Sequence, residues 1–136
     1  AACWYLAEGS ALVPADRFDR ADMLHWLFFE QYNHEPNVAT LRFWLHYLGR
    51  DKLSEVQRGQ LAAKQTAGDA ALRLMDDHLA TRAFFVGDSV TLADIALFAY
   101  THVAEEGGAF ALSDYPAVQA WIARVEGLDR FVAMSD

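Results

Sequence analysis

The chain has 136 residues, a hydrophobic content of 54% and a formal net charge of −8. This length and hydrophobicity predict one folded domain and exclude disorder. The negative charge would repel nucleic acid and anionic membranes, so we expect neither as a partner. Cys3 is the single cysteine, which excludes a disulfide framework and favours a reducing, cytoplasmic location. Because Cys3 has no charged or histidine neighbour to activate its thiol, we expect it to be inert.

Residues 1–14 differ in pattern from the rest of the chain. The apolar run over residues 1–9 predicts the end of a helix that Gly9 terminates. The helix starts at full apolar density without a cap, which indicates continuation from a preceding segment. Residues 10–15, with Pro14 among them, predict a linker.

A long helix is predicted to begin after Asp16, whose carboxylate can cap it. One face of this helix is marked by residues spaced three and four apart, namely Phe18, Ala21, His25, Phe28 and Tyr32. Other faces also carry large apolar side chains, so we expect contact with the domain and with a further partner. Pro36 lacks an amide donor and should end or kink the helix. A second helix, closed by Gly49, is predicted after it.

Ser54 and Gln57 form a capping-box pattern ahead of another long helix. Gly68 weakens that helix, and its expected use is the close approach of another helix. Pro116 suits the first turn of a later helix that Gly127 closes. Because the sequence contains no alternating strand pattern, the predicted fold class is all-α.

Thr91 and Asp94 define the most distinctive stretch of the chain. They form a capping box with Asp in place of Glu: the Thr91 hydroxyl can accept the Asp94 amide, and the Asp94 carboxylate can accept the Thr91 amide. The role predicted for both residues is structural. The helix that begins there is apolar on almost every face, which predicts a central helix with other helices on every side.

Few residues suggest chemistry. The histidines show no metal-ligand spacing, so we expect no metal site, and no nucleotide-binding or serine-hydrolase motif occurs. A cluster of polar residues lies just before Pro36 and consists of Tyr32, Asn33, His34 and Glu35. A helix break at this point can direct side chains towards a pocket. A solvated helix end would explain that group equally well. Tyr100 and His102 form a second candidate wall, for which ordinary packed or rim side chains are the alternative.

The segment from Phe85 to Asp94 contains the capping box of the predicted central helix. Tyr115 and Pro116 precede the predicted helix that carries Trp121. Together with residues 4–9 and the linker after them, these segments resemble the C-terminal domain of glutathione S-transferases and the end of the thioredoxin-like domain before it. The match extends over essentially the whole chain. Residues 29–36 are more similar to bacterial members of the superfamily than to animal ones.

The resemblance implies a helical domain over residues 15–136, with the last helix of a thioredoxin-like domain and a linker over residues 1–14. In the family, that preceding domain holds glutathione and the activating Ser, Tyr or Cys, so no catalytic residue can be assigned to this chain. Glutathione is then a co-substrate of the longer protein, no cofactor is expected, and this chain alone should be inactive. The implied reaction adds glutathione thiolate to a small hydrophobic electrophile.

The resemblance also assigns the electrophile pocket to the two polar groups, which are Tyr32, Asn33, His34, Glu35, Tyr100 and His102. Conjugation, reduction and isomerisation all stay open as the physiological reaction. A second hypothesis is a non-catalytic docking module, since related helical domains also serve as scaffolds. We expect a homodimer, because Trp4, Tyr5 and the first long helix carry apolar surface that a partner should cover.

Overall fold

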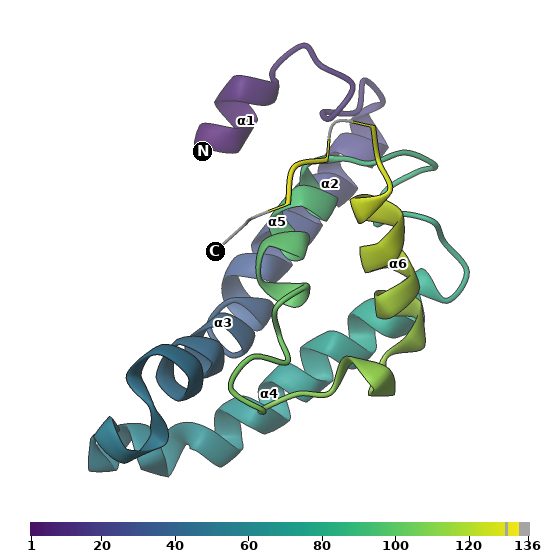
Figure 1. The fold of residues 1–136 in the computed structure, drawn as a ribbon. Helices are drawn as coiled ribbons and strands as arrows, with labels where there is room; N and C mark the ends of the chain where they lie inside the picture. Colours follow the sequence, from purple (N-terminus) through teal and green to yellow (C-terminus); the bar gives the residue numbers. More distant parts are fainter. Residues whose placement is uncertain (130, 134–136) are drawn as a thin grey trace.

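The computed structural model describes residues 1–129 and 131–133. Over these residues the chain forms helices joined by turns and loops, with no strand, so the predicted all-α fold class is confirmed. Within the same ranges, no helix is both long and apolar enough to cross a bilayer. The elements follow in the order α1 (Ala2–Ala7), α2 (Arg17–Phe29), the π-helical turn η1 (Glu30–His34), α3 (Val38–Arg42), the π-helical turn η2 (Phe43–Leu48), the 3-10 turn η3 (Arg50–Lys52), α4 (Glu55–Leu79), α5 (Leu92–Thr101), the 3-10 turn η4 (Leu112–Asp114) and α6 (Pro116–Glu126) (Figure 1).

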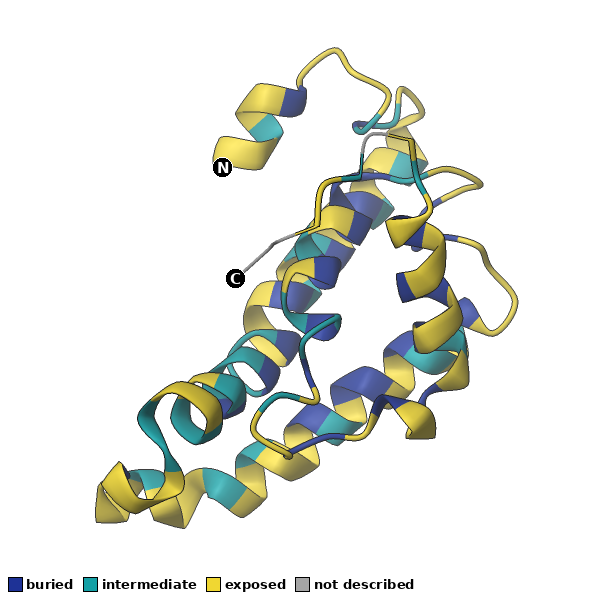
Figure 2. Cartoon of the chain, viewed as in Figure 1, coloured by how far each residue is buried: buried dark blue, intermediate teal, exposed yellow. Residues whose placement is uncertain are grey.

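Helix α5 packs against both α2 and α6, and the long helix α4 packs on α3 and α6 (Figure 1). Buried residues lie mainly on the facing sides of these helices, whereas α1 is largely exposed (Figure 2). Aromatic rings join the elements in the core. Trp26 of α2 packs on Phe85 with ring centroids 4.6 Å apart, and Phe85 meets Trp121 of α6 edge to face at 5.1 Å.

The starts of α2 and α4 follow the caps predicted from the sequence. Oδ1 of Asp16 accepts the backbone N–H groups of Phe18 and Asp19 at 2.8 and 3.1 Å. Ser54 and Gln57 form a capping box, in which the Ser54 N–H donates to Oε1 of Gln57 at 2.9 Å. These side chains satisfy N–H groups that the first helical turn leaves without a partner, which fixes where each helix begins.

The third predicted capping box, at the start of α5, is also formed and is buried. Oδ2 of Asp94 accepts the Thr91 N–H at 2.8 Å and the Thr91 hydroxyl at 3.1 Å, while Oγ1 of Thr91 accepts the Ala93 N–H at 3.3 Å. Oδ1 of Asp94 accepts the Phe85 N–H at 3.1 Å and the indole N–H of Trp121 at 3.0 Å. One carboxyl group therefore ties α5 to the preceding loop and to α6.

The apolar face marked by the spacing in α2 is not the side that faces the core. Phe18, Phe28 and Tyr32 are 76%, 59% and 77% exposed. The core-facing side of α2 and η1 consists instead of Met23, Trp26, Glu30 and His34, all of which are buried. The outer face is thus left without a cover among the described residues, and it is the surface on which a further partner was expected.

Two packing predictions are wrong. Helix α5 is not covered on every side, since Ile95 is 41% exposed and Ala99 is also exposed. At Gly68 the close neighbour is the ring of Phe110, which comes from the segment between α5 and η4 and not from another helix. Both predictions fail for the same reason, because a sequence pattern shows that a face is apolar or tight but not which element covers it.

Candidate functional site

An apolar groove of about 550 Å³ opens between α1, the end of α2 and the N-terminal half of α5. Its volume lies in the range of pockets that hold small ligands. The walls are mainly hydrophobic and include Trp4, Leu24, Leu27, Phe28, Leu92 and Ile95. None of the residues predicted for the electrophile pocket lines this groove.

Glu30 brings an acidic side chain into the groove wall. The residue is only 5% exposed, and its Oε2 accepts the side-chain amide of Gln31 at 2.7 Å. Its Oε1 is not among the buried side-chain atoms that lack a partner, so the carboxyl group meets the groove without being an orphaned buried charge. Burial raises the pKa of Glu30 against the effect of the Gln31 hydrogen bond, and the charge of Glu35 raises it further. Glu30 was missed from the sequence, although its spacing of four from both Trp26 and His34 places all three on one face.

The two polar segments predicted to form a wall lie side by side. Nε2 of His34 in η1 is 2.9 Å from Oγ1 of Thr101 at the end of α5, and both residues are buried. The Thr101 hydroxyl donates its proton to the Leu97 carbonyl at 2.6 Å, so it accepts the hydrogen bond from His34. His34 is therefore the Nε2–H tautomer. Its buried Nδ1 has no partner among the described residues.

His34 joins these segments from beneath their surface. Its side chain is fully buried because it lies on the core-facing side of η1, so it cannot touch a ligand in this structure. Burial lowers the pKa of His34 to about 4, which keeps the imidazole neutral at neutral pH. The sequence placed His34 in the pocket wall, whereas the structure gives it a supporting position.

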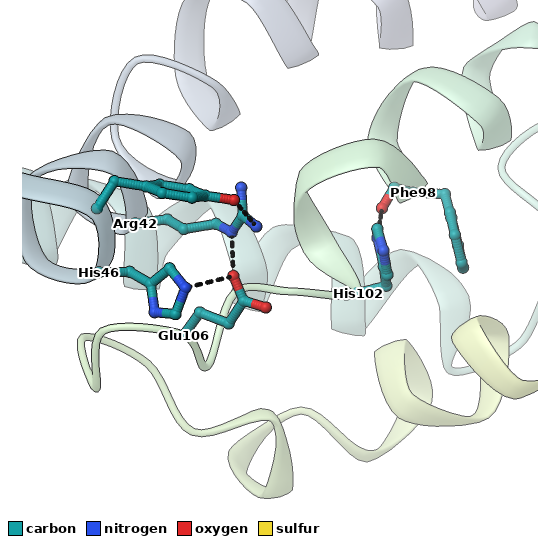
Figure 3. Close-up of polar contacts among 6 residues, drawn as sticks. Arg42, His46, Phe98, His102 and Glu106 are labelled. Carbon is teal, nitrogen blue, oxygen red and sulfur yellow. Dashed lines mark hydrogen bonds and ion pairs between the residues drawn. The ribbon is translucent and has the colours of Figure 1, made fainter. Parts of the chain in front are cut away.

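The other predicted wall residues retain exposed surface. Tyr32 and Asn33 are exposed, and Glu35, Tyr100 and His102 are half-buried. The ring of His102 stacks on that of Phe98 at 4.4 Å, and its Nδ1 lies 2.7 Å from the Phe98 carbonyl, to which it donates (Figure 3). These contacts hold His102 against its own helix. In the described ranges, no group of three His, Cys, Asp or Glu residues could hold a metal ion.

A charged cluster near this wall was missed from the sequence. Nε of Arg42 donates to Oε2 of Glu106 at 2.6 Å (Figure 3), and the Arg42 guanidinium also donates to the Tyr47 hydroxyl at 2.8 Å. Nε2 of His46 lies 3.7 Å from the same Glu106 oxygen. The cluster links α3 and η2 to the segment after α5 across 64 positions in the sequence, so no local pattern could have indicated it. Because its members are partly exposed to solvent, its contribution to stability is modest.

These contacts define a helical domain over the described residues. The capping box at the start of α5 is buried, and its Asp94 carboxyl group is hydrogen-bonded both to the preceding loop and to α6. Residues 23–129 match the family described as "Glutathione S-transferase, C-terminal domain". The chain belongs to this family.

Solved and curated relatives agree with this assignment. A glutathione S-transferase from Pseudomonas fluorescens Pf-5 is 44% identical and superposes with a TM-score of 0.90, over 98% of this chain and 64% of that one. A glutathione transferase from Pseudomonas putida, solved with glutathione disulfide bound, is 26% identical with a TM-score of 0.77, over 91% of this chain and 54% of that one. Elongation factor 1-gamma of Artemia salina is 31% identical over 75% of this chain and 24% of its own length. The chain thus spans between about half and two thirds of these solved transferases.

Proposed function

We propose that this chain is the electrophile-binding domain of a glutathione S-transferase-like enzyme that adds glutathione thiolate to small hydrophobic electrophiles. The observation that carries the proposal is the hydrogen bond between His34 and Thr101. This hydrogen bond joins η1 to the end of α5. In a domain of this family, these are the two segments that we expect to contact the electrophile.

In this proposal the electrophile contacts the accessible side chains around that joint, which are Tyr32, Asn33, Glu35, Tyr100 and His102. The tyrosine rings would supply apolar surface with a hydroxyl at one end. His34 supports the wall from below without touching the ligand. Because its imidazole is buried and neutral, it can fix the spacing of the two segments without adding charge to the site.

Glutathione would bind to a preceding thioredoxin-like domain, of which residues 1–14 form the last helix and a linker to the helical domain at 15–136. The Pseudomonas putida relative, which carries glutathione disulfide, supports glutathione as the thiol co-substrate. The preceding domain would stabilise the thiolate, whose sulfur forms the new bond to the electrophilic atom. The helical domain contributes proximity and an apolar surface, and no residue of its own takes part in bond formation.

Steady-state kinetics on the longer protein, with both substrates varied, test this division of roles. Tyr100→Ala should raise KM for the electrophile or lower kcat, and should change the KM for glutathione by less than about twofold, since the two sites are separate. Phe43→Ala is a control, because Phe43 is also an accessible aromatic residue but lies outside the wall and has no polar side-chain atom. Loss of glutathione affinity in Tyr100→Ala would contradict the assigned wall. Catalysis by the 136-residue chain alone would contradict the assignment of the chemistry to the preceding domain.

We also propose a homodimer in the cytoplasm that covers the exposed apolar face of α2. Phe18 and Phe28 stand on this face, and such a patch is typical of an interface. Sedimentation at tens of micromolar should show a dimer that dissociates when Phe28 is replaced by Ser. A strictly monomeric wild-type protein would contradict this arrangement.

The match to elongation factor 1-gamma favours a second candidate, a non-catalytic docking module. In that case the same helical fold would present its exposed faces to a protein partner. The two candidates differ in one measurement, since a docking module would bind no glutathione even when joined to its preceding segment.

A further inference from the structure

Two contacts join the segment that contains η1 and α3 to the end of α5. The inner bridge is the hydrogen bond between His34 and Thr101. The outer bridge is the ion pair between Arg42, at the end of α3, and Glu106, in the turn after α5 (Figure 3). We propose that Arg42 and Glu106 are positioning residues for the electrophile wall, and that the outer bridge determines how well the wall accepts bulky electrophiles. This inference rests on the proposed function, because the wall is part of that proposal.

The outer bridge lies just beyond the wall on both segments. Arg42 follows Glu35 by seven positions, and Glu106 follows His102 by four. The wall residues Glu35 and His102 therefore lie between the two bridges along the chain. A segment that is held at both ends can shift less than one held at a single end, so the outer bridge limits how far the two sides of the wall can separate.

Backbone packing seats the same turn. Gly107 has a φ of +85°, and a Cβ atom built there would lie 2.9 Å from Cβ of Leu45 and 3.2 Å from the backbone nitrogen of His46. The turn after α5 can approach η2 this closely only because glycine has no side chain. The Arg42 guanidinium is held in turn by the Tyr47 hydroxyl, to which it donates at 2.8 Å. Charge and close packing thus fix one turn against η2.

The outer bridge is better suited to positioning than to holding the fold together. The side chains of Arg42 and Glu106 are 19% and 35% exposed, and ion pairs open to solvent add little to stability. Neither residue belongs to the wall, so each acts through the backbone that leads to His102. Without the bridge, an electrophile that contacts both segments should lose more binding energy than one that contacts a single segment.

Steady-state kinetics of the longer protein with two probes test the inference. Benzyl chloride has one aromatic ring and naphthylmethyl chloride has two; in both, the glutathione sulfur bonds to the CH₂ carbon as chloride leaves. Arg42→Met and Glu106→Met should each lower kcat/KM by roughly tenfold for the two-ring probe and roughly twofold for the one-ring probe, mainly through KM. The double variant should lose no more than either single one, since removing one partner already breaks the bridge.

Two further variants serve as controls for that experiment. Glu106→Gln keeps an acceptor for the Arg42 N–H, so it should retain part of the preference for the two-ring probe that Glu106→Met loses. Arg58→Met replaces an exposed arginine of α4 and should leave kcat/KM for both probes unchanged. A general loss of stability would instead lower the rates for both probes in the same proportion.

Amide hydrogen exchange in the same longer protein reports on the turn itself. The backbone N–H groups of Ala104, Glu106 and Gly108 donate within this turn at 3.0, 3.1 and 3.0 Å. Their exchange should become roughly fivefold faster in Arg42→Met, while α6 exchanges as in the wild type. Equal losses for the two probes, an equal rise in the KM for glutathione, or unchanged exchange in the turn would overturn the inference. A wild type that converts neither probe would overturn the proposed function and the size selection together, whereas faster exchange in Arg42→Met would still establish that the outer bridge holds the turn.

Discussion

Replacing Asp94 by Ala should destabilise the domain far more than the loss of an ordinary helix cap. The carboxyl group accepts hydrogen bonds from the backbone N–H groups of Thr91 and Phe85, from the Thr91 hydroxyl and from the indole of Trp121. Alanine would leave the two backbone N–H groups and the indole N–H without this acceptor in a buried position. The substitution therefore combines a lost cap with orphaned donors contributed by other elements.

The magnitude follows from these separate losses. Removal of a cap costs about 1 kcal/mol, and each buried donor left without a partner costs roughly 1–3 kcal/mol. Burial of the carboxyl group raises the pKa of Asp94, which shows that desolvation offsets part of the gain from its hydrogen bonds. With Phe85 and Trp121 as the added orphans, we expect a total loss of about 3–5 kcal/mol, at the upper end for single substitutions.

Urea unfolding followed by tryptophan fluorescence measures this loss directly. Ser54→Ala is the matched control, because it removes the exposed capping box at the start of α4 and should cost only about 1 kcal/mol. Trp121→Phe, combined with Asp94→Ala in a double-mutant cycle, isolates the coupling between the indole and the carboxylate. Equal losses for Asp94→Ala and Ser54→Ala would refute the idea that Asp94 ties α5 to other elements.

Two further predictions concern His34 and Gly68. The free energy of unfolding should fall by up to about 3 kcal/mol as the pH drops from 6.5 towards 4. The reason is that the unfolded chain binds a proton at His34 in this range, whereas the folded chain excludes that proton until about pH 4. Urea unfolding at both pH values should show this loss in the wild type and not in His34→Gln. Gly68→Ala should lower the free energy of unfolding by about 1–2 kcal/mol despite the better helix propensity of alanine, because the new methyl group would meet the Phe110 ring. If that contact is the cause, adding Phe110→Leu should recover part of the lost stability.

The features predicted correctly from the sequence are local ones. The caps at Asp16, Ser54 and Thr91 each join residues two or three positions apart, so the pattern contains both the donor and the acceptor. Helix ends at Gly49 and Gly127 are likewise set by residues next to the break. Such interactions form from the neighbouring chain whatever else packs around it, which is why the fold class could be predicted.

The candidate site was less accessible to prediction because its decisive contacts are not local. The hydrogen bond from His34 to Thr101 spans 67 positions, and the sequence could place the two segments near each other only through the family resemblance. The burial of His34 and Glu30 was missed because both residues are polar, whereas the aromatic residues Phe28 and Tyr32 beside them in the sequence are the exposed ones. Apolar spacing alone identified the wrong side of α2 as the continuous face, since Phe28 and Tyr32 are exposed.

The two faces of α5 differ in how far the described chain covers them. On the inner face of α5, Asp94 is fully buried and accepts hydrogen bonds from residues outside the helix. Other described residues therefore cover that face. One position later, Ile95 points into the groove, whose surface is apolar and partly open. A helix that is rigidly held on one side and uncovered on the other can present a preformed surface, so a partner that binds there loses little entropy in ordering it. The helix continues to Thr101, whose hydrogen bond with His34 joins the end of α5 to η1.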